Sequence, residues 1–170
     1  GKVNPSGKLA ETYPLSITDN KVNVDFGDGI HDYYDDTIFV GYRYYDYNNI
    51  KVAFPFGYGL SYSKFEYSNF NINKLDETSY EISLDITNIG EYKGKEVVQL
   101  YFSSLDSKII KAKQELLSFK KIELNSKETK TVKFIVNKKD LSYFDVSLDG
   151  WNVDSGTYEI KIAKHSRDIV

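Results

Sequence analysis

Beyond residue 62, hydrophobic and polar positions alternate in short runs that are separated by turn-forming residues. The clearest run is residues 79–87, where even positions are hydrophobic and odd positions are polar. A period of two is typical of a β-strand with one buried face and one solvated face. Weaker runs at 65–70, 98–102, 117–124, 132–136 and 158–162 predict further strands. Together the pattern predicts about seven short strands.

About seven antiparallel strands in roughly 100 residues is the size of an immunoglobulin-like or fibronectin type III-like β-sandwich. The chain has no cysteine, which favours the fibronectin-like form. Residues 139–144 predict one helical turn, and no longer segment has a helical period. We therefore predict an all-β fold with an antiparallel sandwich at residues 63–170, of which 64–166 fold independently. Its predicted core is Leu84, Ile86, Val98, Leu100, Phe119, Phe134, Ile160 and Ile162, with Trp151 buried at one end.

Residues 1–62, here called the N-terminal segment, show no comparable pattern. Prolines and glycines divide the segment into pieces that are too short for a core of their own. It nevertheless carries a dense set of tyrosine and phenylalanine residues, whose surface must pack on something else. We predict a long, mostly irregular, aromatic-rich wrapping segment that lies partly on the sandwich and partly against another domain.

Composition excludes several classes of function. The formal net charge of −3 argues against nucleic acid as a partner. The sequence has no run of about 18 apolar residues, so no membrane-spanning helix is expected. Without cysteine there is no disulfide, zinc–thiolate site or thiol nucleophile. No apolar stretch typical of a secretory signal stands at the start, which favours a bacterial cytoplasmic location over secretion.

Two groups of residues invite a catalytic or metal-binding interpretation that their spacing does not support. Asp25, Asp28, Asp32, Asp35 and Asp36 are acidic, but their order does not fit a calcium loop, and a solvated loop is favoured. His31 and His165 are the only histidines, and we expect both at the surface. Most other carboxylates fall in turns or on polar strand positions, so we predict no catalytic residue, metal or cofactor in this chain.

The densest chemical cluster is Tyr42-Arg43-Tyr44-Tyr45-Asp46. Arginine can stack on tyrosine and can bind a carboxylate in a bidentate manner. Arg43 is one of only two arginines beside 20 lysines, which points to a geometrically demanding role. Tyr42, Arg43, Tyr44 and Asp46 are therefore candidate residues for the rim of a sugar pocket. The alternative, which we favour, is that the cluster fastens the N-terminal segment to its neighbour.

Six motifs occur in order along the chain. They are Asn4-Pro5-Ser6-Gly7-Lys8-Leu9, residues 39–46, residues 54–62, Glu115-Leu116-Leu117-Ser118-Phe119, residues 151–158 and Ser166-Arg167-Asp168-Ile169. Together they resemble the C-terminal region of glycoside hydrolase family 3, the family of β-glucosidases and β-xylosidases. The resemblance implies that residues 1–62 are the extended tail and linker of an α/β domain. It also implies that 63–170 are the family's fibronectin type III-like domain.

The resemblance further implies that the nucleophile and the acid/base of the family lie in domains that precede the matched region. We therefore expect a non-catalytic part of a retaining β-glycosidase, which stabilises and docks the catalytic domains and edges the sugar pocket. Expected partners are those domains, a β-glucoside-type oligosaccharide in the parent enzyme, and a second copy through the aromatic segment 26–62. The alternative is a free-standing carbohydrate-binding or adhesion module.

Overall fold

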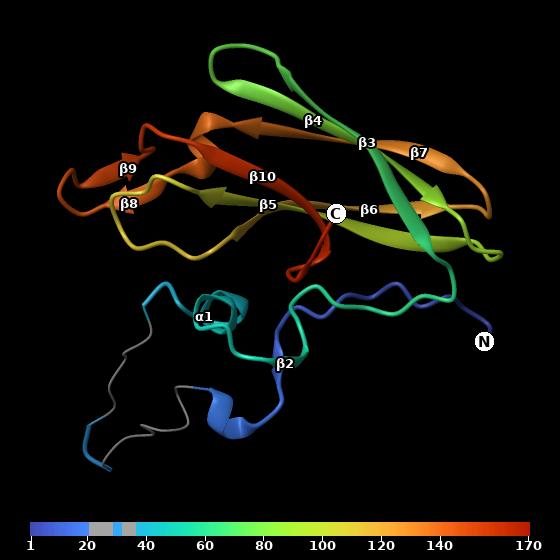
Figure 1. Cartoon of the computed structure of the whole chain (residues 1–170), viewed down its shortest axis with the longest axis horizontal. Helices are drawn as coiled ribbons and strands as arrows, with labels where there is room; N and C mark the ends of the chain where they lie inside the picture. The colour runs from blue at the N-terminus through green and yellow to red at the C-terminus, as the bar shows by residue number, and fades with distance from the viewer. Residues whose placement is uncertain (21–28, 32–36) are drawn as a thin grey trace.

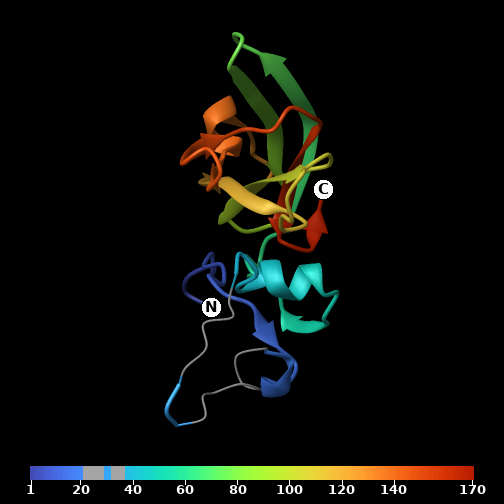
Figure 2. The ribbon, with the colours of Figure 1, turned by 90° about the vertical axis from the view of Figure 1, so that its left-hand side faces the viewer.

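The computed structural model describes residues 1–20, 29–31 and 37–170 of the chain. Two antiparallel sheets stack face to face, and the described part of the N-terminal segment lies beneath one of them (Figure 1). Turning the molecule by a quarter shows the same separation into a sandwich above and the N-terminal segment below (Figure 2). The predicted all-β fold with an antiparallel sandwich is confirmed.

The larger sheet has the strand order β11-β10-β5-β6, and the smaller sheet has the order β3-β4-β7. A two-stranded hairpin, β8-β9, lies at one end of the sandwich (Figure 1). The strands of the two sheets are β3 (Phe65–Lys74), β4 (Ser79–Asn88), β5 (Gly94–Ser104), β6 (Glu115–Leu124), β7 (Thr129–Asn137), β10 (Tyr158–His165) and β11 (Asp168–Ile169). The hairpin strands are β8 (Tyr143–Asp145) and β9 (Gly150–Asn152), and a 3₁₀ helix at Lys138–Leu141 precedes them.

The core lies between the two sheets and follows the predicted alternation. Across the β4–β7 pair, Ile82 opposes Phe134 and Leu84 opposes Val132, so both strands present their hydrophobic positions to the same side. Of the predicted core, six residues are buried and Ile160 packs partly buried against them; the six are Leu84, Ile86, Val98, Leu100, Phe134 and Ile162.

The prediction that Phe119 belongs to the core is wrong, because its side chain is 63% exposed. In β6 the inward positions are set by Ile122 and Leu124, and Phe119 has the opposite phase. The pairing with β5 is irregular at Leu117, which is an extra residue without a partner, and Leu117 itself packs against the core. Positions on the two sides of this irregularity do not follow one alternation. The sequence pattern does not reveal it.

The prediction that Trp151 fills one end of the sandwich is also wrong. Its side chain is 74% exposed on β9. Trp151 and Phe144 are cross-strand partners in the hairpin, and their rings meet edge to face with centroids 6.0 Å apart. Cross-strand partners project from the same face of a hairpin, and in this hairpin both rings lie on the exposed face.

The described part of the N-terminal segment contains two short strands and a short helix. Strands β1 (Tyr13–Pro14) and β2 (Val52–Phe54) pair with each other, and a 3₁₀ helix occupies Ile17–Asp19. Helix α1 (Tyr42–Tyr47) was not expected, because six residues are too few to establish a helical period. No helix in the described ranges has the length and apolar character needed to cross a membrane.

We predict that Phe134→Ala lowers the free energy of unfolding by about 3–5 kcal/mol, since it removes a large side chain that is 2% exposed. Phe119→Ala deletes the same atoms from an exposed site and should change stability by less than about 0.5 kcal/mol. Urea denaturation of both variants measures the difference. Equal losses would contradict the register described for β6 and β7.

Candidate functional site at the junction of the two parts

Strand β5 is buried on both faces, which is unusual for the sheet of an antiparallel sandwich. Val98 and Leu100 point into the core between the sheets. The intervening residues Gln99 and Tyr101 are also buried, although they project from the other face. The N-terminal segment covers that face, so the structure contains a junction between residues 1–62 and the outer side of the larger sheet (Figure 1).

Gln99 is the central polar contact of this junction. Its Nε2 donates to the carbonyl of Gly57 at 3.1 Å and to that of Lys164 at 2.8 Å. Its Oε1 accepts a hydrogen bond from the Tyr101 hydroxyl at 2.7 Å. Both amide protons are therefore used, and burial of the side chain leaves no unpaired donor. Burial of Tyr101 raises the pKa of its phenol, so the hydroxyl stays protonated and can donate to Gln99.

Gly57 lies directly against Gln99 and has a φ of +81°, which favours glycine. A Cβ at this position would lie 2.2 Å from Gln99 Oε1 and 2.6 Å from Nε2. Both atoms are held by hydrogen bonds, so they cannot move aside without loss of those bonds. The close approach of the two chain segments therefore depends on the absence of a side chain at residue 57.

Main-chain hydrogen bonds extend the contact around Gly57 in both directions. The Ser166 amide donates to the Phe56 carbonyl at 2.9 Å, and this joins the β10–β11 turn to the N-terminal segment. The Gly57 amide donates to the Leu9 carbonyl, and the Leu9 amide donates to the Tyr58 carbonyl, each at 2.8 Å. Residues near 9 and near 57 are thus held together where they meet the sheet.

The predicted rim residue Tyr42 faces the sandwich. Its hydroxyl accepts a hydrogen bond from the Leu116 amide at 2.8 Å. Its ring stacks on Phe56 with centroids 4.8 Å apart and meets the edge of Tyr101 at 6.1 Å. Burial raises the pKa of Tyr42, against the smaller opposing effects of its bond to Leu116 and of nearby Arg43.

The charged candidates of the cluster also pair with the sandwich. Arg43 forms an ion pair with Glu115 at 3.0 Å. Asp46 Oδ1 accepts from Arg167 Nε at 2.6 Å, so both arginines of the chain bridge the junction. Tyr44 does not share this arrangement; its ring lies edge-on to Tyr45 with centroids 5.3 Å apart.

Three of the four candidates therefore contact the sandwich, as expected if the cluster fastens the N-terminal segment to its neighbour. Contact of Tyr42, Arg43, Tyr44 or Asp46 with a sugar stays a prediction. Burial raises the pKa of Asp46, and the charges of Arg167 and Lys113 act in the opposite direction. The Asp46 carboxylate thus depends on its cationic neighbours to stay ionised.

A second attachment lies near the start of the chain. Asn4 Oδ1 accepts from the Ser61 hydroxyl and the Tyr62 amide, while its Nδ2 donates to the Lys93 carbonyl at 3.0 Å. Lys8 forms an ion pair with the buried carboxylate of Glu96 at 3.0 Å. Sequence reasoning did not single out Asn4, Gln99 or Gly57 for these roles, although Asn4 and Gly57 occur in the motifs that carry the family resemblance.

The two histidines differ in environment. His31 is exposed, as expected. His165 is half-buried at the junction, with its ring centroid 5.7 Å from that of Tyr58, and burial lowers its pKa. The aspartates weighed as a calcium loop, residues 25, 28, 32, 35 and 36, lie outside the described residues. Within the described ranges, no group of His, Asp or Glu is arranged to hold a metal ion.

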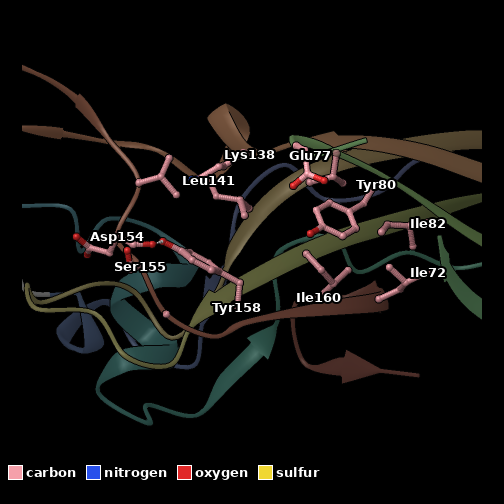
Figure 3. Close-up of a pocket in the computed structure, with 13 residues that line it drawn as sticks. Ile72, Glu77, Tyr80, Ile82, Lys138, Leu141, Asp154, Ser155, Tyr158 and Ile160 are labelled. Atoms are coloured by element: carbon pink, nitrogen blue, oxygen red, sulfur yellow. Dashed lines mark hydrogen bonds between the residues drawn. The ribbon is translucent and has the colours of Figure 1, made fainter. Parts of the chain in front are cut away.

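A separate cleft of about 520 Å³ opens at one end of the sandwich, between the two sheets (Figure 3). Aliphatic side chains and the rings of Tyr80 and Tyr158 line it. Glu77 lies beside Tyr80, and Asp154 lies at the other end of the cleft (Figure 3). Asp154 accepts from the Tyr143 hydroxyl at 3.0 Å and has Lys111 Nζ at 3.9 Å, so its carboxylate serves the local packing.

Comparison with known proteins agrees with this architecture. The family model for the fibronectin type III-like domain matches residues 96–166. A thermostable beta-glucosidase B from Acetivibrio thermocellus is 44% identical over 174 aligned residues, which cover all of this chain and 23% of that protein.

Solved structures give the same result. The beta-glucosidase from Kluyveromyces marxianus in complex with glucose is 42% identical and superposes with a TM-score of 0.94, over all of this chain and 21% of that one. Beta-glucosidase 3B from Thermotoga neapolitana, also in complex with glucose, is 38% identical with a TM-score of 0.89, over 99% of this chain and 24% of that one. The chain thus spans about a fifth to a quarter of the length of the relatives it matches.

We predict that Gly57→Ala loosens the junction, because the added Cβ collides with Gln99 and the backbone has positive φ. Gly41→Ala is the matched control, since Gly41 has a φ of +56° but a Cβ added there would meet no atom within 4 Å. Alanine at either position strains a backbone with positive φ, and only Gly57→Ala adds the loss of Gln99 hydrogen bonds.

Hydrogen exchange of the Leu9 and Ser166 amides measures this difference, since the Ser166 amide bonds to Phe56 across the junction and the Leu9 amide bonds to Tyr58 beside Gly57. Faster exchange is expected in Gly57→Ala and near-native exchange in Gly41→Ala. Equal protection of these amides in the two variants would show that the Gly57–Gln99 approach does not hold the junction.

Proposed function

We propose that this chain is the non-catalytic C-terminal part of a retaining β-glycosidase. Over its whole length it corresponds to the C-terminal region of glycoside hydrolase family 3 β-glucosidases. The parent enzyme is of the β-glucosidase or β-xylosidase type. In it, the chain stabilises the catalytic domains, docks against them and contributes to the edge of the sugar pocket. The observation that carries this proposal is the two-sided burial of β5 by the core and the N-terminal segment.

The chemistry of retention explains why the chain alone is expected to be inactive. Retaining hydrolysis needs two carboxyl groups about 5 Å apart, one as nucleophile and one as acid/base. The resemblance assigns both groups to domains that precede the matched region. Hydrogen bonds to a sugar from the rim alone would bind substrate and transition state alike, and would not accelerate bond cleavage.

Support for docking comes from the far side of the N-terminal segment. The inner side of the segment is fixed to β5, whereas several large apolar residues of the segment are exposed to solvent. They are Leu15, Ile17, Val40, Tyr47, Phe54, Leu60 and Tyr62. Such an apolar surface is typical of one that a further domain covers. Tyr44 belongs to the same segment, its ring packs edge-on against Tyr45, and it is the candidate that we place at the pocket edge.

Purified chain is expected to show no turnover of nitrophenyl β-glucoside or β-xyloside. Size-exclusion chromatography of the same sample tests whether the aromatic segment 26–62 causes self-association, which we expect in the absence of the catalytic domains. Turnover that survives repurification and follows the protein peak would overturn the non-catalytic assignment.

Docking is tested by mixing the chain with the catalytic domains of the parent enzyme. Tyr62→Ala should weaken the recovered complex, because Tyr62 is 61% exposed on the proposed contact surface. Phe119→Ala is the matched control, since Phe119 is 63% exposed on the sandwich and lies outside that surface. Equal recovery with both variants would contradict this placement of the docking surface.

The alternative, a carbohydrate-binding module, is favoured by one observation. Trp151 and Phe144 form an exposed aromatic pair on the β8–β9 hairpin, and such rings can stack on sugars. Trp151 is the single tryptophan, so its fluorescence reports directly on this site. A saturable shift in its emission on titration with cellobiose would support the alternative. Under the proposed function, emission stays close to that of free indole throughout the titration.

A further inference from the structure

A second cavity lies where the N-terminal segment meets the β10–β11 turn. It has a volume of about 390 Å³, within the range of small-molecule sites. Asp46 and Lys51 line it from the N-terminal segment, and Lys113, Lys161, Ser166 and Arg167 line it from the sandwich. Its walls therefore come from both sides of the junction, and every wall residue belongs to this chain.

The charges at this cavity are unbalanced. Arg167 is neutralised by Asp46, through the 2.6 Å bond between Nε and Oδ1. Lys113 Nζ donates to the neutral side-chain oxygen of Asn49, and no ion pair to Lys113 or Lys51 exists within the described residues. The cavity thus concentrates positive charge in a chain whose net charge is −3. Clefts lined by one sign of charge attract ions of the opposite sign.

Lys161 adds to this excess from β10. Its Nζ lies 2.9 Å from the Ser103 hydroxyl and 3.1 Å from Glu159, whose carboxylate is half exposed to solvent. An exposed carboxylate is screened by water and neutralises its partner only weakly. Lys161 therefore keeps electrostatic attraction for an anion inside the cavity.

Two residues that line the cavity each hold a buried polar atom that has no partner among the described residues. Ser166 is 3% exposed, and its Oγ makes no hydrogen bond. Asp46 Oδ2 is likewise unpaired, although Oδ1 is bonded to Arg167. Buried polar groups without partners are rare in folded proteins. A hydroxyl group can both donate to a carboxylate oxygen and accept from a serine hydroxyl, so it fits both unpaired atoms.

We propose that this cavity binds a small oxyanion that also carries hydroxyl groups, of the class of a carboxylated or phosphorylated sugar. Lys51, Lys113 and Lys161 contact the acidic group, while Asp46 and Ser166 face the hydroxyl-bearing part. The proposal is independent of the function proposed above, because it needs only residues of this chain.

Isothermal titration of the full chain tests the proposal, with D-glucuronate, D-glucose 6-phosphate, inorganic phosphate and D-glucose as ligands. Ionic strength is held constant with chloride, because salt screens charge interactions. We expect saturable binding of at least one sugar acid, and no binding of glucose. Tighter binding of glucuronate identifies a carboxylate as the preferred group, and tighter binding of glucose 6-phosphate identifies a phosphate.

The double variant Lys51→Gln/Lys113→Gln should weaken that binding about tenfold or more. Lys121→Gln is the control, as an exposed lysine on β6 outside the cavity, and should leave it unchanged. Both lysines of the double variant are exposed, so the melting temperature should stay native and separate loss of binding from loss of fold. Absence of saturable binding by both sugar acids, whether or not inorganic phosphate binds, or equal weakening in the control, overturns the proposal.

Discussion

The structure depends on the requirement that both faces of β5 be shielded from water. One face completes the hydrophobic core, and the other presents Gln99 and Tyr101, which are buried only because the N-terminal segment lies over them. Exposing that face would return an amide and a phenol to solvent and leave the carbonyl of Gly57 without its donor. The N-terminal segment therefore acts as a third layer of the fold, and a sandwich without it would present an unusual surface.

The polar character of the junction determines how precisely its two parts are oriented. Apolar surfaces can slide past each other at little cost, whereas hydrogen bonds and ion pairs require particular distances and angles. Here Gln99, the ion pairs of Arg43 and Arg167, and the bond from Asn4 to Lys93 act at separate points along the segment. Several such contacts fix one orientation, which is what a docking element needs in order to place its outer surface reproducibly.

Much of the sandwich could be predicted from the sequence, because β4 and β7 alternate strictly and lack irregularities. The errors arose where a local feature interrupts that rule. The register shift at Leu117 means that Leu117 and Phe119 do not share a face, and the hairpin geometry placed Trp151 outside. Gln99 was missed for another reason: a polar residue on the outward phase of a strand predicts solvent, and only the tertiary structure shows what covers it.

Rarity of a residue type was a better guide to the junction than periodicity. Arg43 stands out because arginine is scarce in this chain. Arg43 and Arg167 each form an ion pair across the junction, with Glu115 and Asp46 respectively. Arginine suits such a place, because its planar group keeps its charge when half-buried and bonds at fixed angles. Lysines instead dominate the exposed surface, where position matters less. Both arginines thus make oriented ion pairs across the junction, and among the lysines Lys8 does the same through its ion pair with Glu96.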